Sequence, residues 1–253
     1  MLRSSFVACL CLAIVTAAAI TAPAAPLVYD AANDYSTTNN PNGVWSYGYA
    51  PSLGGTFTLF PYNGDWTVPP LNLWYVIAPG IGPCAGKNMG SEPWVYPSAV
   101  FDAGQFNLAP GTPDLVVLRW TAPISGSFQI EALFEGMQRP DGTTTDVHVL
   151  LSGVSIYDAI VDGWVGRPYD PNPRSGPSPE QSFSGVVSLL AGETIDFAVG
   201  NMGNGQNCDG TGLSARITEM TSPIPEPAAL IVWWLLGASG VTLGWWRRRK
   251  RAG

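Results

Sequence analysis

The sequence predicts an all-β protein in which residues 25–222 fold as a jelly-roll-like antiparallel β-sandwich. Three observations predict this fold class. Short runs rich in β-branched and aromatic residues place apolar side chains at every second position, which is typical of half-buried strands. Turn-forming segments such as Pro140-Asp141-Gly142 separate these runs. Helical periodicity is not evident before residue 228, and many short strands at close spacing favour a sandwich.

The N-terminal half of this region is rich in aromatic residues and long loops. We expect short strands at 44–49, 55–60 and 71–77. Three rings share one face of the first strand: Trp45, Tyr47 and Tyr49. Such a row either joins the core or forms an exposed platform on which a sugar ring stacks, and we take these three as candidate ligand-binding residues. Further candidates for such stacking are Trp66, Trp74 and Trp94.

Clearer strands follow in the second half, at 115–120, 127–134, 146–151, 186–190, 194–199 and 213–218. In SFQIEALF, the apolar residues Phe128, Ile130 and Ala132 alternate with polar ones. The same alternation sets one face of two other strands: Val147, Val149 and Leu151, and Ile195, Phe197 and Val199. Because successive side chains of a strand point to opposite faces, we expect these sets to face the core.

Charge is distributed unevenly along the chain. Residues 25–224 carry six basic and 18 acidic side chains, a net charge of −12, whereas basic residues gather at the C-terminus. Such an acidic domain would repel phosphate, which excludes nucleic acid as a partner.

Both ends of the chain are hydrophobic. Residues 1–24 have the order of a secretory signal peptide, with Arg3, an apolar run and an A-x-A-type site at 22–24 for signal peptidase. Residues 228–246 contain no charged residue and are long enough to form a transmembrane helix. The basic cluster in the tail 247–253 would stay cytoplasmic and leave the large domain outside the membrane.

The C-terminal order of Pro225-Glu226-Pro227, apolar span and arginine cluster resembles the PEP-CTERM sorting signal, also labelled the ice-binding protein C-terminal domain. On this resemblance, residues 223–253 are a sorting segment recognised by an exosortase, which removes the helix and delivers the protein to the cell envelope or extracellular matrix. The sorting motif comprises Pro225, Glu226, Pro227, Arg247, Arg248 and Arg249. A plain membrane anchor is the alternative.

Four segments of the central region, 40–48, 120–130, 146–153 and 182–217, together resemble a recurrent secreted domain often found upstream of PEP-CTERM tails. This resemblance implies a β-sandwich like those of lectins and carbohydrate-binding modules. It implies no settled activity.

Cys84 and Cys208 are the cysteines left after removal of the signal peptide, and we expect both to lie in Gly-rich loops. An oxidising compartment favours a disulfide bond between them. No metal site or cofactor is expected, because C-x-x-C is absent and His148 is the one histidine. Oxygen-rich loops near 141–146 and 204–209 are interpreted as turns rather than calcium sites.

No catalytic residue is assigned. The motif G-x-S-x-G is absent, His148 lies within an expected strand, and the many carboxylates show no signature of a glycosidase pair. We therefore expect a non-enzymatic exported protein that binds polysaccharide or has a structural role in exopolysaccharide or biofilm. The alternative is a secreted carbohydrate-active enzyme similar to a glycoside hydrolase.

Overall fold

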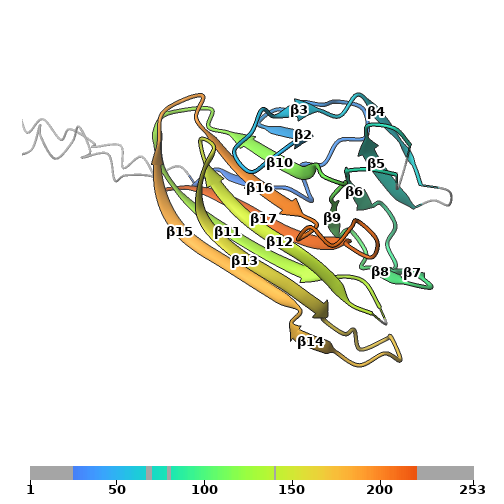
Figure 1. Cartoon of the computed structure of the whole chain (residues 1–253). Helices are drawn as coiled ribbons and strands as arrows, with labels where there is room; N and C mark the ends of the chain where they lie inside the picture. Colours follow the sequence, from blue (N-terminus) through green and yellow to red (C-terminus); the bar gives the residue numbers. More distant parts are fainter. Residues whose placement is uncertain (1–24, 67–69, 79–80, 140, 221–253) are drawn as a thin grey trace, which may run out of the picture. The chain divides into compact units, whose positions relative to one another are not determined.

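Two antiparallel β-sheets pack face to face in the computed structural model of the chain, which describes residues 25–66, 70–78, 81–139 and 141–220 (Figure 1). Residues 26–220 form one compact unit. The predicted signal peptide and sorting segment, including Pro225-Glu226-Pro227 and the arginines at 247–249, lie outside the described residues. Among the residues described, no helix is long and apolar enough to cross a membrane.

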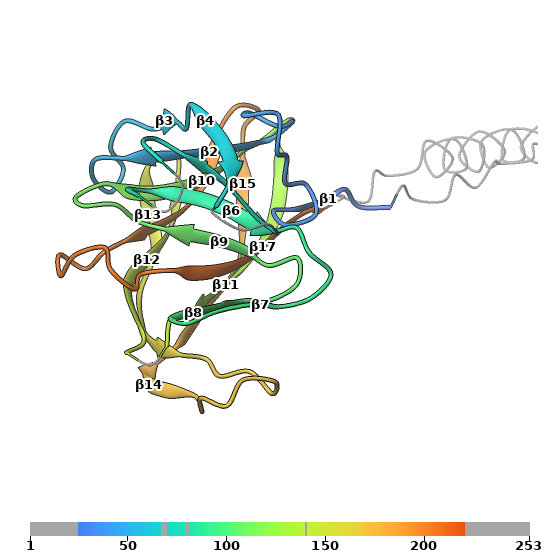
Figure 2. The same cartoon turned by 90° about the vertical axis from the view of Figure 1, so that its right-hand side faces the viewer.

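The described strands form two large sheets and one separate hairpin (Figure 2). The first sheet has the order β15 (Glu180–Leu189), β11 (Gly126–Gly136), β17 (Thr211–Met220), β9 (Phe106–Ala109), β6 (Cys84–Asn88), β5 (Leu71–Tyr75) and β4 (Tyr62–Asp65), with β1 (Val28–Asp30) also paired to β17. The second has the order β14 (Ser175–Ser178), β13 (Val154–Trp164), β12 (Thr143–Leu151), β16 (Thr194–Gly200), β10 (Leu115–Thr121), β2 (Trp45–Ala50) and β3 (Thr58–Leu59). The hairpin consists of β7 (Trp94–Tyr96) and β8 (Ala99–Phe101). The predicted jelly-roll-like antiparallel β-sandwich is confirmed.

The main core lies between the two sheets. The inward sets predicted from alternation are there: Phe128 and Ile130 of β11 and Val147 of β12 are fully buried. Phe197 of β16 joins them. Burying one such side chain contributes about 1.5–3 kcal/mol, so these strands supply much of the driving force for the sandwich.

Several strands carry no alternation and were not predicted. In β13, Val154, Ile156 and Ile160 face outward and are exposed, while Val161 faces inward, so both faces are apolar. β6 is a strand although it lies in a Gly-rich segment. A Cβ on Gly86 would lie 2.1 Å from the carbonyl oxygen of Asn72, so glycine lets β6 approach β5. The predicted strand at 55–60 reduces to β3.

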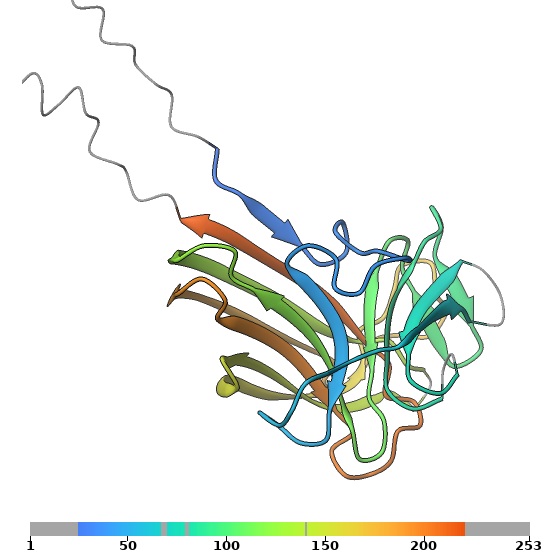
Figure 3. The ribbon, with the colours of Figure 1, turned by 90° about the horizontal axis from the view of Figure 1, so that it is seen from above.

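The first and last described strands lie side by side (Figure 3). β1 pairs with β17 so that Val28 is opposite Thr218. The two ends of the described chain therefore leave the sandwich at the same end of β17, where Met220 lies. The opposite end of β17 begins at Thr211, about 30 Å away at roughly 3.3 Å per residue.

Candidate functional site

A cavity of about 250 Å³ opens at the Thr211 end of β17. Its floor comes from β5, β6 and β9, and its sides come from the β7–β8 hairpin and the loop between β16 and β17. The lining combines rings, apolar side chains and polar groups: Trp66, Leu71, Leu73, Cys84, Tyr96, Ser98, Phe101, Asn107, Ala109, Gln138, Gln206, Asn207, Cys208, Asp209 and Gly210. Segments from most of the chain length therefore meet at one place.

One wall of the cavity is aromatic. Trp66 packs edge-on against Trp94, with ring centroids 5.5 Å apart, and Tyr96 lies 5.4 Å from Trp66. Phe101, from the paired strand of the hairpin, lies 5.3 Å from Trp94. Tyr96 keeps 39% of its surface exposed. The cluster thus offers ring surface to a ligand while its own members hold one another in place.

A second part of the lining, the polar wall, comes from the loop that precedes β17. Gln206, Asn207 and Asp209 line the cavity from this loop, and Gln138 joins them from the end of β11. A Cβ on Gly210 would lie 2.7 Å from the Gln138 amide nitrogen, so glycine at this position leaves room for the Gln138 side chain. Amides and acids of this kind bind hydroxyl groups by hydrogen bonds.

Asp209 is the most unusual group of the cavity. It is only 2% exposed; its Oδ1 accepts a hydrogen bond from the Thr144 hydroxyl at 3.3 Å, and its Oδ2 has no hydrogen-bond partner among the described residues. Burial raises the pKa of Asp209 to about 7, opposed by the hydrogen bonds from Thr144 and increased by the charge of Asp146. The carboxyl group therefore changes charge near neutral pH.

The loop of residues 201–210 is held in one conformation by contacts on both sides. The Met202 amide donates to Asp146 at 2.7 Å, and the Thr143 hydroxyl donates to the Gly210 carbonyl at 2.9 Å. Met202 and Cys208 have left-handed backbone angles, with φ of 51° and 63°, which non-glycine residues seldom adopt. Surrounding contacts must compensate such conformations, so the polar wall is preorganised.

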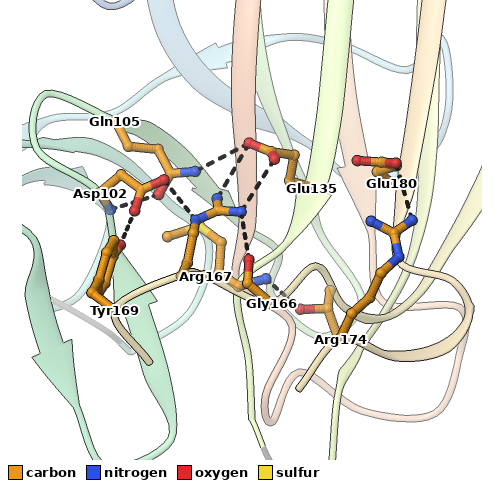
Figure 4. Close-up of polar contacts among 10 residues, drawn as sticks. Asp102, Gln105, Glu135, Gly166, Arg167, Tyr169, Arg174 and Glu180 are labelled. Carbon is orange, nitrogen blue, oxygen red and sulfur yellow. Dashed lines mark hydrogen bonds and ion pairs between the residues drawn. The ribbon is translucent and has the colours of Figure 1, made fainter. Parts of the chain in front are cut away.

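The hairpin that carries the aromatic wall is fixed from behind by two arginines. The Arg139 backbone amide donates to the Ser98 carbonyl at 2.7 Å, and its guanidinium pairs with Asp170 at 3.1 Å. Arg167 pairs with Asp102, just after β8, at 2.7 Å, and with Glu135 of β11 at 3.4 Å (Figure 4).

Tyr169 completes this arrangement. Its hydroxyl donates a hydrogen bond to Asp102, which Arg167 holds from the other side. Burial and the hydrogen bond to Asp102 raise the pKa of Tyr169, so the hydroxyl stays a donor. The loop after β13 is thereby fastened to the end of the hairpin (Figure 4). These contacts position the hairpin that carries the ring wall. Neither Arg139 nor Arg167 lines the cavity.

Two other hollows of the described structure lack a ring wall open to a ligand. One, of about 250 Å³, is lined by Asp30, Gln105 and Glu135, with the fully buried Phe106 behind them. The other, of about 10 Å³, lies under the 52–57 loop where Arg119 stacks on Phe57. The cavity beside β17 is therefore the candidate functional site.

The structure corrects the prediction that Trp45, Tyr47 and Tyr49 form a sugar-stacking row. The three rings share one face of β2 as expected, but that face is turned into the core, with Trp45 1% and Tyr47 0% exposed. Tyr47 stacks on Trp74 at 6.1 Å, and burial raises its pKa to about 12. Trp45 and Tyr47 cannot reach a glycan, because the first sheet covers them. Tyr49 is partly buried, and its ring stacks on Phe60 with ring centroids 5.7 Å apart.

The predicted disulfide bond between Cys84 and Cys208 is not seen in the described structure. Cys84 lies in β6, not in a loop, while Cys208 lies in the β16–β17 loop as expected. Both residues line the cavity, but no disulfide bond joins them. Burial raises the pKa of the Cys208 thiol, with the charges of Asp141 and Asp209 adding to the effect.

His148 lies on the outer face of β12 between two carboxylates. Its Nε2 is 2.7 Å from Asp146 and its Nδ1 is 2.5 Å from Asp158, the residue opposite it on β13. Burial alone would lower the pKa of His148, but the hydrogen bonds to both carboxylates outweigh it and raise the pKa. The Ser155 hydroxyl donates to Asp158 rather than to the imidazole. The geometry is that of a strand-to-strand link.

Sequence reasoning found part of the cavity. Trp66 and Trp94 were among the ring candidates, and the structure brings them together, whereas Trp74 is buried in β5. Asp209 lies in a loop noted only for its oxygen-rich turns. No cluster of three or more potential metal ligands occurs in the described part of the chain. Tyr96 and Gln138 carried no signal of their own.

Comparisons with known proteins give a distant likeness of fold. No family model and no curated protein matches the sequence. The structure is similar to a family 35 carbohydrate binding module from Clostridium thermocellum, with 11% identity over 77% of this chain and 98% of that chain and a TM-score of 0.28. It is similar to the K1 cleaved adhesin domain of Lys-gingipain from Porphyromonas gingivalis, with 10% identity over 78% and 99% of the two chains and a TM-score of 0.35.

A third similar structure is that of the CBM51-2 and INT domains of Clostridium perfringens ZmpB in complex with GlcNAc, with 14% identity and a TM-score of 0.31. The match covers 48% of this chain and 23% of that one, so the chain spans about a quarter of its length.

Proposed function

We propose that the protein is a non-enzymatic carbohydrate-binding protein, and that the cavity beside β17 holds a sugar unit of a polysaccharide. The observation that carries this proposal is that aromatic rings and a group of amides with one acid line the same cavity. A sugar ring has apolar C–H faces and an equator of hydroxyl groups. The two walls match these two kinds of surface.

The size and stiffness of the cavity support the same proposal. Its volume of about 250 Å³ lies just below the ~300–1,000 Å³ of pockets that take drug-sized ligands, which suits one or two sugar units. Both walls are preorganised, one by Arg139 and Arg167 and the other by left-handed residues of the loop. A rigid site avoids much of the entropy cost of binding a flexible chain.

The acid content of the cavity supports binding rather than hydrolysis. A glycosidase uses two carboxyl groups on either side of the scissile bond. Asp209 is the one acidic residue among the described residues that line the cavity. A secreted hydrolase therefore has no specific observation in its favour at this site.

We further propose that the protein is exported and sorted to the cell envelope or extracellular matrix, where it binds exopolysaccharide. The support is the sequence of the two ends: the signal peptide at 1–24, and the PEP-CTERM-like segment with its exosortase motif at 223–253. The predicted sorting segment follows Met220 in the sequence, and Met220 is at the end of β17 opposite the cavity.

A glycan screen tests the binding proposal. We expect the purified protein to bind a subset of polysaccharides without releasing reducing ends from them. Product release would contradict the non-enzymatic assignment, and a lack of any binding across plant, algal and bacterial glycans would contradict carbohydrate binding.

An intact-mass measurement tests the sorting proposal. We expect the mass of the exported protein to correspond to a chain without residues 228–253. Retention of these residues in every fraction would favour a plain anchor.

A further inference from the structure

The cavity contains two buried acceptor atoms that the protein itself leaves without partners. They are Oδ2 of Asp209 and Oε1 of Gln138, and neither has a hydrogen-bond partner among the described residues. A buried acceptor without a partner costs about 1–3 kcal/mol. Both atoms have almost no accessible surface, so a ligand reaches them when the two side chains turn toward the cavity. A ligand that then donates hydrogen bonds to these two atoms recovers that cost, whereas a ligand that brings further acceptors does not.

The cavity offers no positive charge to a ligand. No lysine, arginine or histidine is among its described lining residues. One of the two N–H groups of the Asn107 amide already donates to the Gly86 carbonyl at 3.1 Å, and the remaining amide donors of the lining carry no charge. A carboxylate, sulfate or phosphate group on a sugar would therefore enter without a cationic partner and lose its hydration.

The surroundings of Asp209 add negative charge. The charge of Asp146 on β12 acts on Asp209 and raises its pKa, and Asp146 is itself paired with His148 on the outer face. Asp141, in the turn between β11 and β12, acts on the neighbouring Cys208 thiol, which also lines the cavity. Each of these groups disfavours an anion at this place.

We propose that Asp209 and Gln138 are specificity-determining acceptors, and that the cavity selects an uncharged, hydroxyl-donating sugar unit and rejects uronic acids and other acidic sugars. This inference rests on the proposed carbohydrate binding and names the ligand class for that site. Selection follows from the two unpartnered acceptors and from the absence of a cationic side chain in the described lining.

Titration of Asp209 makes this selection depend on pH. Its pKa of about 7 means that the group is neutral at pH 5 and ionised at pH 8. The neutral form can donate a hydrogen bond to a sugar carboxylate, and the ionised form repels it. Discrimination against uronic acids should therefore grow as the pH rises from 5 to 8.

The test uses matched sugars that differ in one group. Neutral oligosaccharides of gluco, galacto and manno configuration are compared with their C6-oxidised counterparts, which carry a carboxylate in place of CH₂OH. Affinities are measured by titration calorimetry on the full chain at pH 5 and pH 8. We expect the neutral member of the binding pair to be favoured by about tenfold or more at pH 8 and by less than about threefold at pH 5.

Two variants identify the acceptors. Asp209→Asn keeps the oxygen that accepts from Thr144 but cannot ionise, so its preference should be the same at both pH values. Gln138→Met removes the second acceptor at similar volume and should weaken the neutral sugar about fivefold at both pH values. Asp114→Asn, in the turn before β10 and away from the cavity, is the matched control and should behave as the wild type.

The outcomes separate the two proposals. Equal or tighter binding of the acidic sugars at pH 8 would overturn this inference and leave carbohydrate binding intact. So would an unchanged pH dependence in Asp209→Asn. Failure of both members of every pair to bind would instead overturn the proposed function, and this inference with it.

Discussion

Two rows of aromatic residues, WSYGY in β2 and WVY in β7, occupy opposite environments in the same fold. Trp45 and Tyr47 of β2 are 1% and 0% exposed, whereas Tyr96 of β7 is 39% exposed. Both rows alternate, so their local sequence is equally suited to a strand. Only one of them can offer ring surface to a ligand.

The difference comes from what covers each strand. β2 is hydrogen-bonded between β10 and β3, and the first sheet packs over its inward face, where Trp74 stacks on Tyr47. β7 pairs in the described structure with β8, and its rings pack on each other and on Trp66 and Phe101 beside the cavity. An aromatic row thus belongs to the core or to a site according to its place in the sheet order. The following variants test this comparison.

The largest effect is expected in β2. Trp45→Ala should lower the free energy of unfolding by about 3–5 kcal/mol, because it leaves a cavity in the main core and removes the hydrogen bond from the indole to Asp34. Urea denaturation measures the loss, and Trp45→Phe, which keeps a ring, should lose less. A loss below about 1 kcal/mol together with lost glycan binding would restore Trp45 as a platform residue.

A smaller loss is expected behind the hairpin. Arg167→Met should lower the free energy of unfolding by about 1–3 kcal/mol, because Asp102 and Glu135 lose their common partner. Arg174→Met is the matched control, since its pair with Glu180 has side chains 50% and 45% exposed and contributes at most about 1 kcal/mol (Figure 4). Equal losses in both variants would show that Arg167 does not hold the hairpin.

The next effect concerns affinity rather than stability. Tyr96→Ala should weaken glycan binding about tenfold and change the free energy of unfolding by less than about 1 kcal/mol, because its exposed ring contributes more to the cavity than to the core. Tyr62→Ala is the control, since Tyr62 is 55% exposed on β4 and does not line the cavity. If the two variants bind glycan equally well, the ring wall is not the binding surface.

The sequence predicted individual strands better than it predicted which strands lie side by side. Period-two patterning identified β11 and its inward residues Phe128 and Ile130, because burial of one face leaves a direct trace in the sequence. The same pattern could not say whether Trp45 faces core or solvent, because alternation is identical in both cases. Contacts between β6, β9 and β17 bring Trp66 and Asp209 to one cavity. Such long-range pairing leaves no local pattern to read.

The smallest expected effect lies outside both aromatic rows, in the link between β12 and β13. The raised pKa of His148 means that its protonated form stabilises the fold, so this contribution is full below its ordinary pKa of 6.5 and is lost as the pH rises through the raised value. The hydrogen bond from Ser155 and that with His148 lower the pKa of Asp158, so its contribution is lost at acid pH instead.

We therefore expect the free energy of unfolding to fall between pH 6 and pH 9 by slightly more in the wild type than in His148→Asn. The difference should be less than about 1 kcal/mol, because the Asp158 side chain is 60% exposed and solvent screens the pair. Burial of Asp209 also makes the free energy of unfolding fall as the pH rises, between its ordinary pKa of 3.8 and its raised pKa of about 7. This range overlaps the one measured here. Both chains are therefore measured in the Asp209→Asn background, which removes the contribution of Asp209. Identical slopes in this background would show that the imidazole between Asp146 and Asp158 does not couple the two strands to pH.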